Sequence, residues 1–145
     1  MTRLSNSELV RERRVGRSRI VSANPASRSA KPLSELVTLA FGPPFVVGEE
    51  FHSLGALAVA IYGSWAARST GAAGHAPNDV DVLVIGKVAR RDMYQAAERA
   101  ERAERRLGLP VNAVLCAPSR WLHASDPLIQ QIRSAPVVWV AGEEP

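Results

Sequence analysis

The sequence lacks several features that would assign it to a specialised class of protein. No apolar run reaches the roughly 20 residues that a membrane-spanning helix needs, and Leu54–Tyr62 is among the longest. The N-terminal segment carries charges where a secretory signal peptide has an apolar stretch. With a single cysteine, Cys116, an internal disulfide is excluded, and its apolar neighbours predict a buried side chain. We therefore expect a cytoplasmic protein with no membrane attachment.

Metal-binding patterns of histidine and internal repeats are also missing. The three histidines, His52, His75 and His123, show no spacing typical of metal ligands. Apolar residues make up 46% of the chain and charged residues 22%, a balance that excludes a disordered protein. At 145 residues, the chain has room for one packed domain and an attachment, but not for two complete domains.

Positive charge is concentrated at the N-terminus. Residues 1–31 hold eight basic side chains and only two acids, Glu8 and Glu12. Because the whole chain has a net charge of +4, the remaining residues are mildly acidic. A basic segment attached to an acidic domain indicates that one part contacts nucleic acid or another polyanion while the other part does something else.

The basic segment contains a predicted β-hairpin. Leu9–Ala23 alternates apolar and charged residues on both sides of a turn that contains glycine. Its polar positions are almost all arginine, and its apolar residues are too few to bury a face without help. We therefore predict a hairpin arm and linker over residues 1–31 and a main domain over residues 32–145.

The rest of the chain alternates predicted helices with predicted strands. This order is typical of a layered α/β domain with its strands inside. Periodicity, glycine and proline predict helices over Leu33–Phe41, Phe45–Leu54, Trp65–Arg68, Arg90–Leu107 and Pro127–Arg133, and strands over Ala56–Tyr62, Val80–Ile85, Val111–Ala117 and Val137–Ala141.

Two short motifs in this domain suggest chemistry. Gly63-Ser64 joins a strand to a helix, where free backbone N–H groups and the helix dipole favour a phosphate. Asp79 and Asp81 lie two residues apart on an otherwise apolar strand, so their carboxylates share one face. Such a pair repels itself unless a cation lies between the two acids, and Mg²⁺ prefers carboxylate and phosphate oxygens. Together the motifs predict a site for a metal ion and a nucleotide's phosphates.

Each motif also has a simpler interpretation. A Gly-Ser pair that ends a strand is common in turns. Asp79 could cap a strand end, and Asp81 could be exposed on a sheet edge. The tryptophans, Trp65, Trp121 and Trp139, have apolar neighbours and are more typical of packing than of base stacking.

Taken together, Gly63-Ser64 and Asp79-Val80-Asp81-Val82 resemble the signature of the nucleotidyltransferase superfamily that includes DNA polymerase beta and the aminoglycoside nucleotidyltransferases. The resemblance covers roughly Ala56–Ala141 and is to the minimal, single-domain branch. It implies an α+β fold with a small mixed sheet flanked by helices. It further implies that Gly63 and Ser64 contact a nucleoside triphosphate, that Asp79 and Asp81 hold Mg²⁺ or Mn²⁺, and that Arg68 lies near the phosphates.

Two departures from this family pattern bear on activity. The loop between Ser64 and Asp79 is a few residues longer than in compact members. The third carboxylate that active members place on the next strand is matched here by Asn112. An amide cannot act as a base, although Asn112 could still bind a metal or a substrate through its carbonyl oxygen.

The hairpin also resembles a known element, the wing of a winged helix-turn-helix domain. Bacterial regulators are known in which that domain precedes a minimal nucleotidyltransferase, but the recognition helix is missing here. A truncated winged helix would still contact the DNA backbone through its arginines. The alternative is a solvated basic arm. The candidate DNA contacts are Arg11, Arg13, Arg14, Arg17 and Arg19.

Two functions follow as hypotheses. The first is Mg²⁺-dependent transfer of a nucleoside monophosphate from a nucleoside triphosphate to a hydroxyl acceptor. The second is a weakly active or inactive nucleotide-binding module that acts as a DNA-binding transcriptional regulator or as a toxin-antitoxin component. A protein partner or a homodimer would be contacted through Phe45, Phe51 and Leu54.

Overall fold

The computed structural model describes residues 7–124 and 126–145. The chain divides into two compact units, one that ends at Ala40 and one that runs from Phe41 to Pro145. The boundary predicted between residues 31 and 32 falls inside a helix, α2, that spans Ala30–Phe41.

The N-terminal unit contains the predicted hairpin. Strand β1 (Val10–Val15) pairs with β2 (Ser18–Ala23) in antiparallel fashion, with Val15 opposite Ser18. The two-residue turn begins at Gly16, whose φ of +59° suits glycine. No residue from 7 to 40 is buried, so this unit has no core of its own.

Prolines account for two differences between the expected and observed helix ends. Helix α2 begins at Ala30 rather than Leu33, because Pro32 lies in the first turn, where its missing N–H is not needed. Helix α3 (Pro43–Phe51) likewise begins on two prolines that we expected only to end the preceding helix. A short 3-10 helix, His52–Leu54, follows α3.

The second unit is built on a mixed four-stranded sheet in the order β5-β4-β3-β6. Strand β3 pairs antiparallel with both β4 and β6, whereas β4 pairs parallel with β5. The expected small mixed sheet is confirmed. The strands are β3 (Ala58–Tyr62), β4 (Val80–Ile85), β5 (Val111–Cys116) and β6 (Val138–Ala141).

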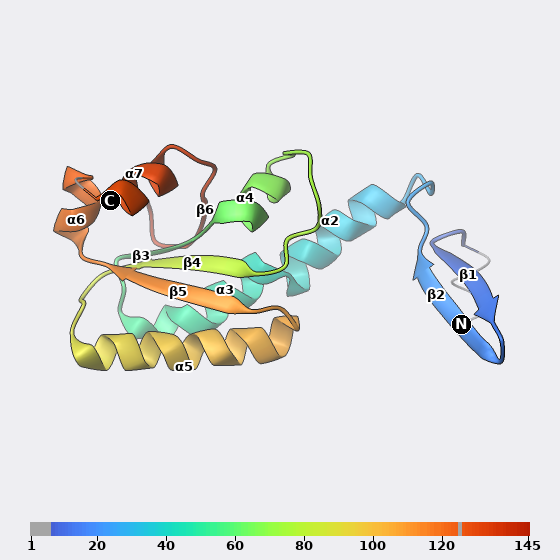
Figure 1. Ribbon diagram of the computed structural model, residues 1–145, viewed down its shortest axis with the longest axis horizontal. Coiled ribbons are helices and arrows are strands. Elements are labelled where there is room, and N and C mark those ends of the chain that lie inside the picture. The colour runs from blue at the N-terminus through green and yellow to red at the C-terminus, as the bar shows by residue number, and fades with distance from the viewer. Residues whose placement is uncertain (1–6, 125) are drawn as a thin grey trace. The chain divides into compact units, whose positions relative to one another are not determined.

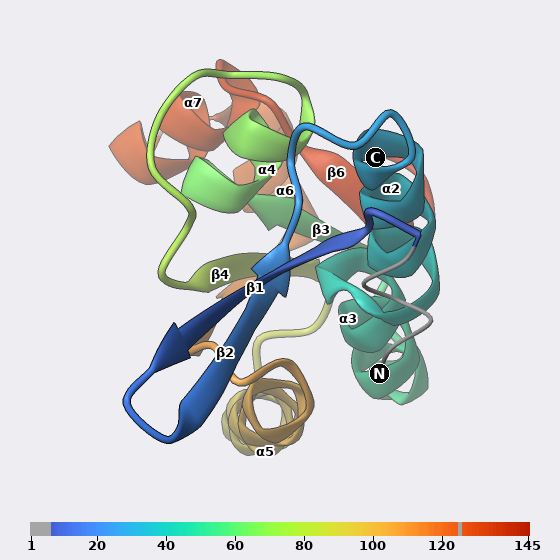
Figure 2. The ribbon, with the colours of Figure 1, turned by 90° about the vertical axis from the view of Figure 1, so that its right-hand side faces the viewer.

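Helices cover both faces of this sheet. Figure 1 shows α3 and α5 on one side and α4, α6 and α7 on the other, and Figure 2 shows the same layers along the axis of α5. Sequence periodicity did not reveal α6, which begins at Pro118 in the first helical position. The helices are α4 (Gly63–Ser69), α5 (Arg90–Leu107), α6 (Pro118–His123) and α7 (Pro127–Arg133).

Side chains of β4 alternate between the two layers of the core, as its sequence predicts. Val80, Val82 and Val84 pack on the side of α3 and α5, whereas Leu83 and Ile85 pack with Cys116 and Trp121 on the other side. Cys116 is fully buried, as expected. Trp121 is also buried and meets Trp139 edge to face, with ring centroids 5.7 Å apart. The packing interpretation of these two tryptophans is confirmed.

In the described part of the chain, no helix is both long enough and apolar enough to cross a membrane.

Candidate functional site

The predicted site residues meet at the end of the sheet where β3 finishes and β4 and β5 begin. Asp81 lies opposite Tyr62 of β3 and beside Asn112 of β5 in the strand register. The simpler interpretation required Asp81 to be exposed on a sheet edge. Because β4 is an inner strand, Asp81 is not on an edge. Both Asp79 and Asp81 are half-buried.

The two carboxylates converge on one atom, the side-chain nitrogen of Asn112. Nδ2 of Asn112 donates to Oδ2 of Asp79 at 3.3 Å and to Oδ1 of Asp81 at 3.1 Å. Each of its two hydrogens therefore serves one acid. The neutral amide satisfies two negative groups that would otherwise repel each other.

Gly63 brings the strand-to-helix turn against the same acids. Its φ is +73°, and a Cβ built on it would lie only 2.6 Å from Oδ2 of Asp81. A side chain at position 63 would therefore displace the Asp81 carboxylate. The glycine lets the backbone of the turn and the carboxylate approach each other.

Ser64 and Arg68 lie around an adjoining hollow rather than at the Asn112 amide. The hollow has a volume of about 460 Å³ and is also lined by Asp79 and by the loop residues 72–78. Nη1 of Arg68 donates to the Ala72 carbonyl at 2.8 Å, so its guanidinium is held against this loop. Asp79 thus belongs both to the pair of acids and to the lining of the hollow where Ser64 and Arg68 lie.

The electrostatics of the site reflect its two acids. Partial burial raises the pKa of Asp81, the hydrogen bond from Asn112 lowers it, and the charge of Asp79 raises it further, with a net upward shift. Burial also raises the pKa of Tyr62, and the charges of Asp81 and Asp79 add to that rise. The Tyr62 hydroxyl therefore remains protonated at neutral pH.

The donor set fits a Mg²⁺ ion that shares its coordination with a ligand. Oxygens of Asp79 and Asp81 lie 3.3 and 3.1 Å from the Asn112 nitrogen, farther than the roughly 2 Å of a Mg²⁺–oxygen bond. One Mg²⁺ would therefore have to displace this amide and draw the two carboxylates closer to bind both. Mg²⁺ commonly takes one or two protein carboxylates and completes its shell with water and phosphate oxygens. No group of three or more acids, histidines or cysteines among the described residues could form a complete protein cage.

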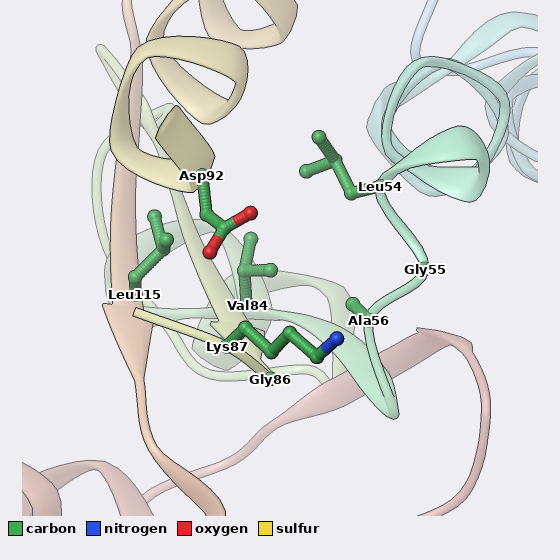
Figure 3. A pocket seen from close by; sticks show the side chains of 8 residues that line it. All are labelled: Leu54, Gly55, Ala56, Val84, Gly86, Lys87, Asp92 and Leu115. Atoms are coloured by element: carbon green, nitrogen blue, oxygen red, sulfur yellow. The ribbon is translucent and has the colours of Figure 1, made fainter. Parts of the chain in front are cut away.

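A second hollow lies at the opposite end of β4 and contains none of the predicted site residues. Figure 3 shows Lys87 and Asp92 among its lining side chains, and its volume is about 210 Å³. Oδ2 of Asp92 accepts a hydrogen bond from the Ala89 N–H at 3.0 Å, so this carboxylate serves the start of α5.

The hairpin arginines are all exposed, but they do not share one face. The strand register places Arg11 and Arg13 on one side of the hairpin and Arg14 and Arg19 on the other, with Arg17 in the turn. Arg19 forms an ion pair with Glu12, and Nε of Arg11 donates to Oδ1 of Asn24 at 2.7 Å. The hairpin therefore offers positive charge on both sides.

The suggested protein contact through three apolar residues needs one correction. Phe51 is fully buried against the sheet and cannot face a partner, whereas Phe45 is 41% exposed. The helical spacing of α3 directs Phe51 into the core.

Sequence reasoning missed Tyr62 as a neighbour of the acids. The residue precedes Gly63 directly, but which strand it opposes depends on the pairing of β3 with β4, and no local pattern gives that pairing.

Comparisons with protein-family models, with curated proteins and with solved structures find no match for this chain.

Proposed function

We propose that this chain binds a nucleoside triphosphate together with Mg²⁺ and transfers the nucleoside monophosphate to a hydroxyl acceptor. The observation that supports this proposal best is the convergence of Asp79 and Asp81 beside Gly63. Paired carboxylates next to a close backbone turn suit a cation that carries phosphate.

In the proposed transfer, the acceptor oxygen forms a bond to the α-phosphorus. The bond from that phosphorus to the bridging oxygen breaks, and pyrophosphate leaves with the electron pair. A bound Mg²⁺ supplies charge neutralisation and orientation of the phosphates. Asp79 and Asp81 would hold it, and Ser64 and Arg68 would contact the ligand from the adjoining hollow.

The proton of the acceptor has no base among the residues that meet at the acids. Asn112 is an amide, and Tyr62 keeps its own proton because its pKa is raised. The proton therefore passes to solvent, and positioning of the reactants supplies most of the rate enhancement.

The test is incubation with each of ATP, CTP, GTP and UTP, labelled at the α-phosphate, with Mg²⁺ and candidate acceptors. Transfer of label that Asp81→Asn abolishes would support the proposal. As a matched control, Asp126→Asn changes another half-buried aspartate, one that binds Arg120 away from the site. Transfer that both variants retain would contradict the assignment of the acids.

A second candidate function is nucleotide binding without transfer, coupled to DNA binding by the hairpin. Asn112 favours it, because an amide replaces the expected third carboxylate and donates a hydrogen bond to each acid of the pair without a metal. Magnesium-dependent binding of a nucleotide without any transfer of label would select this candidate over the first.

DNA binding has its own test, an electrophoretic shift over a range of salt concentrations. Alanine at Arg13, Arg14 and Arg17 should weaken binding to any sequence and reduce its salt dependence. The matched control removes the same number of charges from α5, at Arg91, Arg102 and Arg105. Equal losses in both variants, or no binding at low salt, would reject a role for the hairpin.

A further inference from the structure

The outer edge of β5 is open in the described part of the chain. Strand β5 pairs only with β4. The Val80 N–H donates to the Pro110 carbonyl at 2.9 Å, and the Gly86 N–H donates to the Cys116 carbonyl at 3.0 Å. Backbone groups of even-numbered residues therefore point to β4, and by alternation those of Val111, Ala113 and Leu115 point outward.

This edge lacks the features by which proteins usually protect an exposed strand. The six residues of β5 include no charge and no proline. The other edge of the sheet, β6, is shorter, with four residues, and its pairing with β3 is interrupted between Val59 and Ala60. Strand β5 is thus the more readily extended edge.

A groove of about 720 Å³ runs along β5 and is lined by residues 111–115 of the strand and by one side of α5. Met93 and Val88 line it and are 57% and 44% exposed. An added strand would pair with the unpaired backbone groups of β5, and the helix that covers that strand would bury the apolar side chains beside them.

The charges around the groove are self-complementary. Glu101 and Glu104 line it from the later turns of α5. Arg120 lines it from α6 and is paired with Asp126. Arg90 and Arg91 lie outside this lining, in the first turn of α5. In two copies related by a two-fold axis, the α5 helices run antiparallel, so the first turn of one helix lies toward the later turns of the other. Each copy then brings arginines toward the partner's acids, which favours a second copy over an unrelated peptide.

We propose that β5 pairs antiparallel with β5 of a second copy, with the two-fold axis at Ala113. Two four-stranded sheets then become one continuous sheet, and the two α5 helices lie side by side beneath it. Ala113 exchanges both backbone hydrogen bonds with its counterpart, and Val111 lies opposite the partner's Leu115. This interface does not depend on the proposed nucleotide chemistry.

The first test is sedimentation of the full-length chain over a range of concentrations. Ala113→Pro removes an outward N–H without touching the pairing with β4, since proline is tolerated on the open side of an edge strand. Two lost hydrogen bonds per dimer should raise the dimer dissociation constant by about tenfold or more. Ala113→Ser keeps the N–H and is the matched control.

The second test does not depend on how well the proline variant folds. In the proposed register the two Ala113 Cα atoms lie about 5.5 Å apart, a separation that a disulfide can span. Ala113→Cys should therefore form a covalent dimer on mild oxidation. The unaltered chain, whose cysteine is buried, should not.

Three results would overturn the proposal. One is a monomer at every concentration. Another is a dimer that Ala113→Pro and Ala113→Ser leave equally stable, and the third is the absence of a covalent dimer from Ala113→Cys.

Discussion

Replacing Gly63 by alanine tests whether the turn and the Asp81 carboxylate are in contact. Two effects add at this position, the left-handed backbone and a clash with the Asp81 carboxylate. A left-handed backbone costs an alanine about 1–2 kcal/mol, and the lower entropy of the unfolded chain returns about 0.4–1 kcal/mol. In addition, a Cβ at position 63 would lie 2.6 Å from Oδ2 of Asp81, so the carboxylate must move, which disturbs the hydrogen bond that it accepts from the Asn112 amide.

Gly108 provides a control that has the left-handed backbone but no clash. Its φ is +67°, close to that of Gly63, but a Cβ there would meet nothing within 4 Å. An off-rotamer side chain and a weakened hydrogen bond each cost about 1 kcal/mol. We therefore expect Gly63→Ala to lower the free energy of unfolding by about 1–2 kcal/mol more than Gly108→Ala.

Urea denaturation of both variants, alone and with Asp81→Ala, measures this difference. The excess cost of Gly63→Ala should disappear when Asp81 is alanine, because the displaced carboxylate is then missing. Equal costs for the two glycine variants would refute the contact. So would an excess that persists without the carboxylate.

Three further predictions concern the acids and the core. Asn112→Asp should destabilise the metal-free protein, because a third negative charge replaces the amide that binds Asp79 and Asp81, and added Mg²⁺ should restore stability in thermal unfolding. An increase in nucleotide transfer by this variant would support the first proposed function, and indifference to Mg²⁺ would argue against a metal site. The pKa of Asp81 is raised in the folded state, so its charge costs stability as pH rises through that pKa. Asp81→Asn should therefore gain stability relative to the unaltered chain between acid and neutral pH, a trend that urea titrations at several pH values would show or exclude. Trp121→Ala should lower the free energy of unfolding by about 3–5 kcal/mol, since the side chain is 1% exposed and packs against Trp139. Trp65→Ala should lower it less, because Trp65 is only partly buried.

Local sequence patterns predicted the elements of the second unit well where periodicity was strong. The bounds of β4, α5 and α7 agree with those expected, because valine alternation, helical alanine spacing and flanking glycine or proline all indicate the same ends. The prolines of α2 and α3 were misleading, since proline ends one helix and begins the next with equal ease.

The sequence predicted the two acids of the site, but it did not predict which residues surround them. Two aspartates at a spacing of two predicted a shared face, and the structure has them converge. That Asn112 donates to both, and that Tyr62 lies opposite Asp81, depends on the pairing of β4 with β5 and β3. Strand partners far apart in the chain are set by tertiary packing, which local patterns do not contain.

Asn112 both hydrogen-bonds the paired acids and lies on the open edge of β5. In the proposed dimer, the partner's Val114 lies opposite Asn112 and restricts the strand that carries it. A restricted amide stays between Asp79 and Asp81 and competes with a cation for the same oxygens. Dimerisation and Mg²⁺ binding should therefore oppose each other, and by linkage each should weaken the other by the same factor.

The pair of variants at Ala113 measures this coupling directly. Ala113→Pro, whose dimer should dissociate more readily, should bind Mg²⁺ more tightly in calorimetry than Ala113→Ser at a concentration where only the latter is mainly dimeric. Conversely, Mg²⁺ should shift the sedimentation of the serine variant toward monomer. The Asn112→Ala variant should lose the coupling while it keeps the dimer, because the competing donor is gone but the outward backbone groups of β5 are intact. Equal Mg²⁺ affinities for the proline and serine variants would show that the edge of the sheet and the acids act independently.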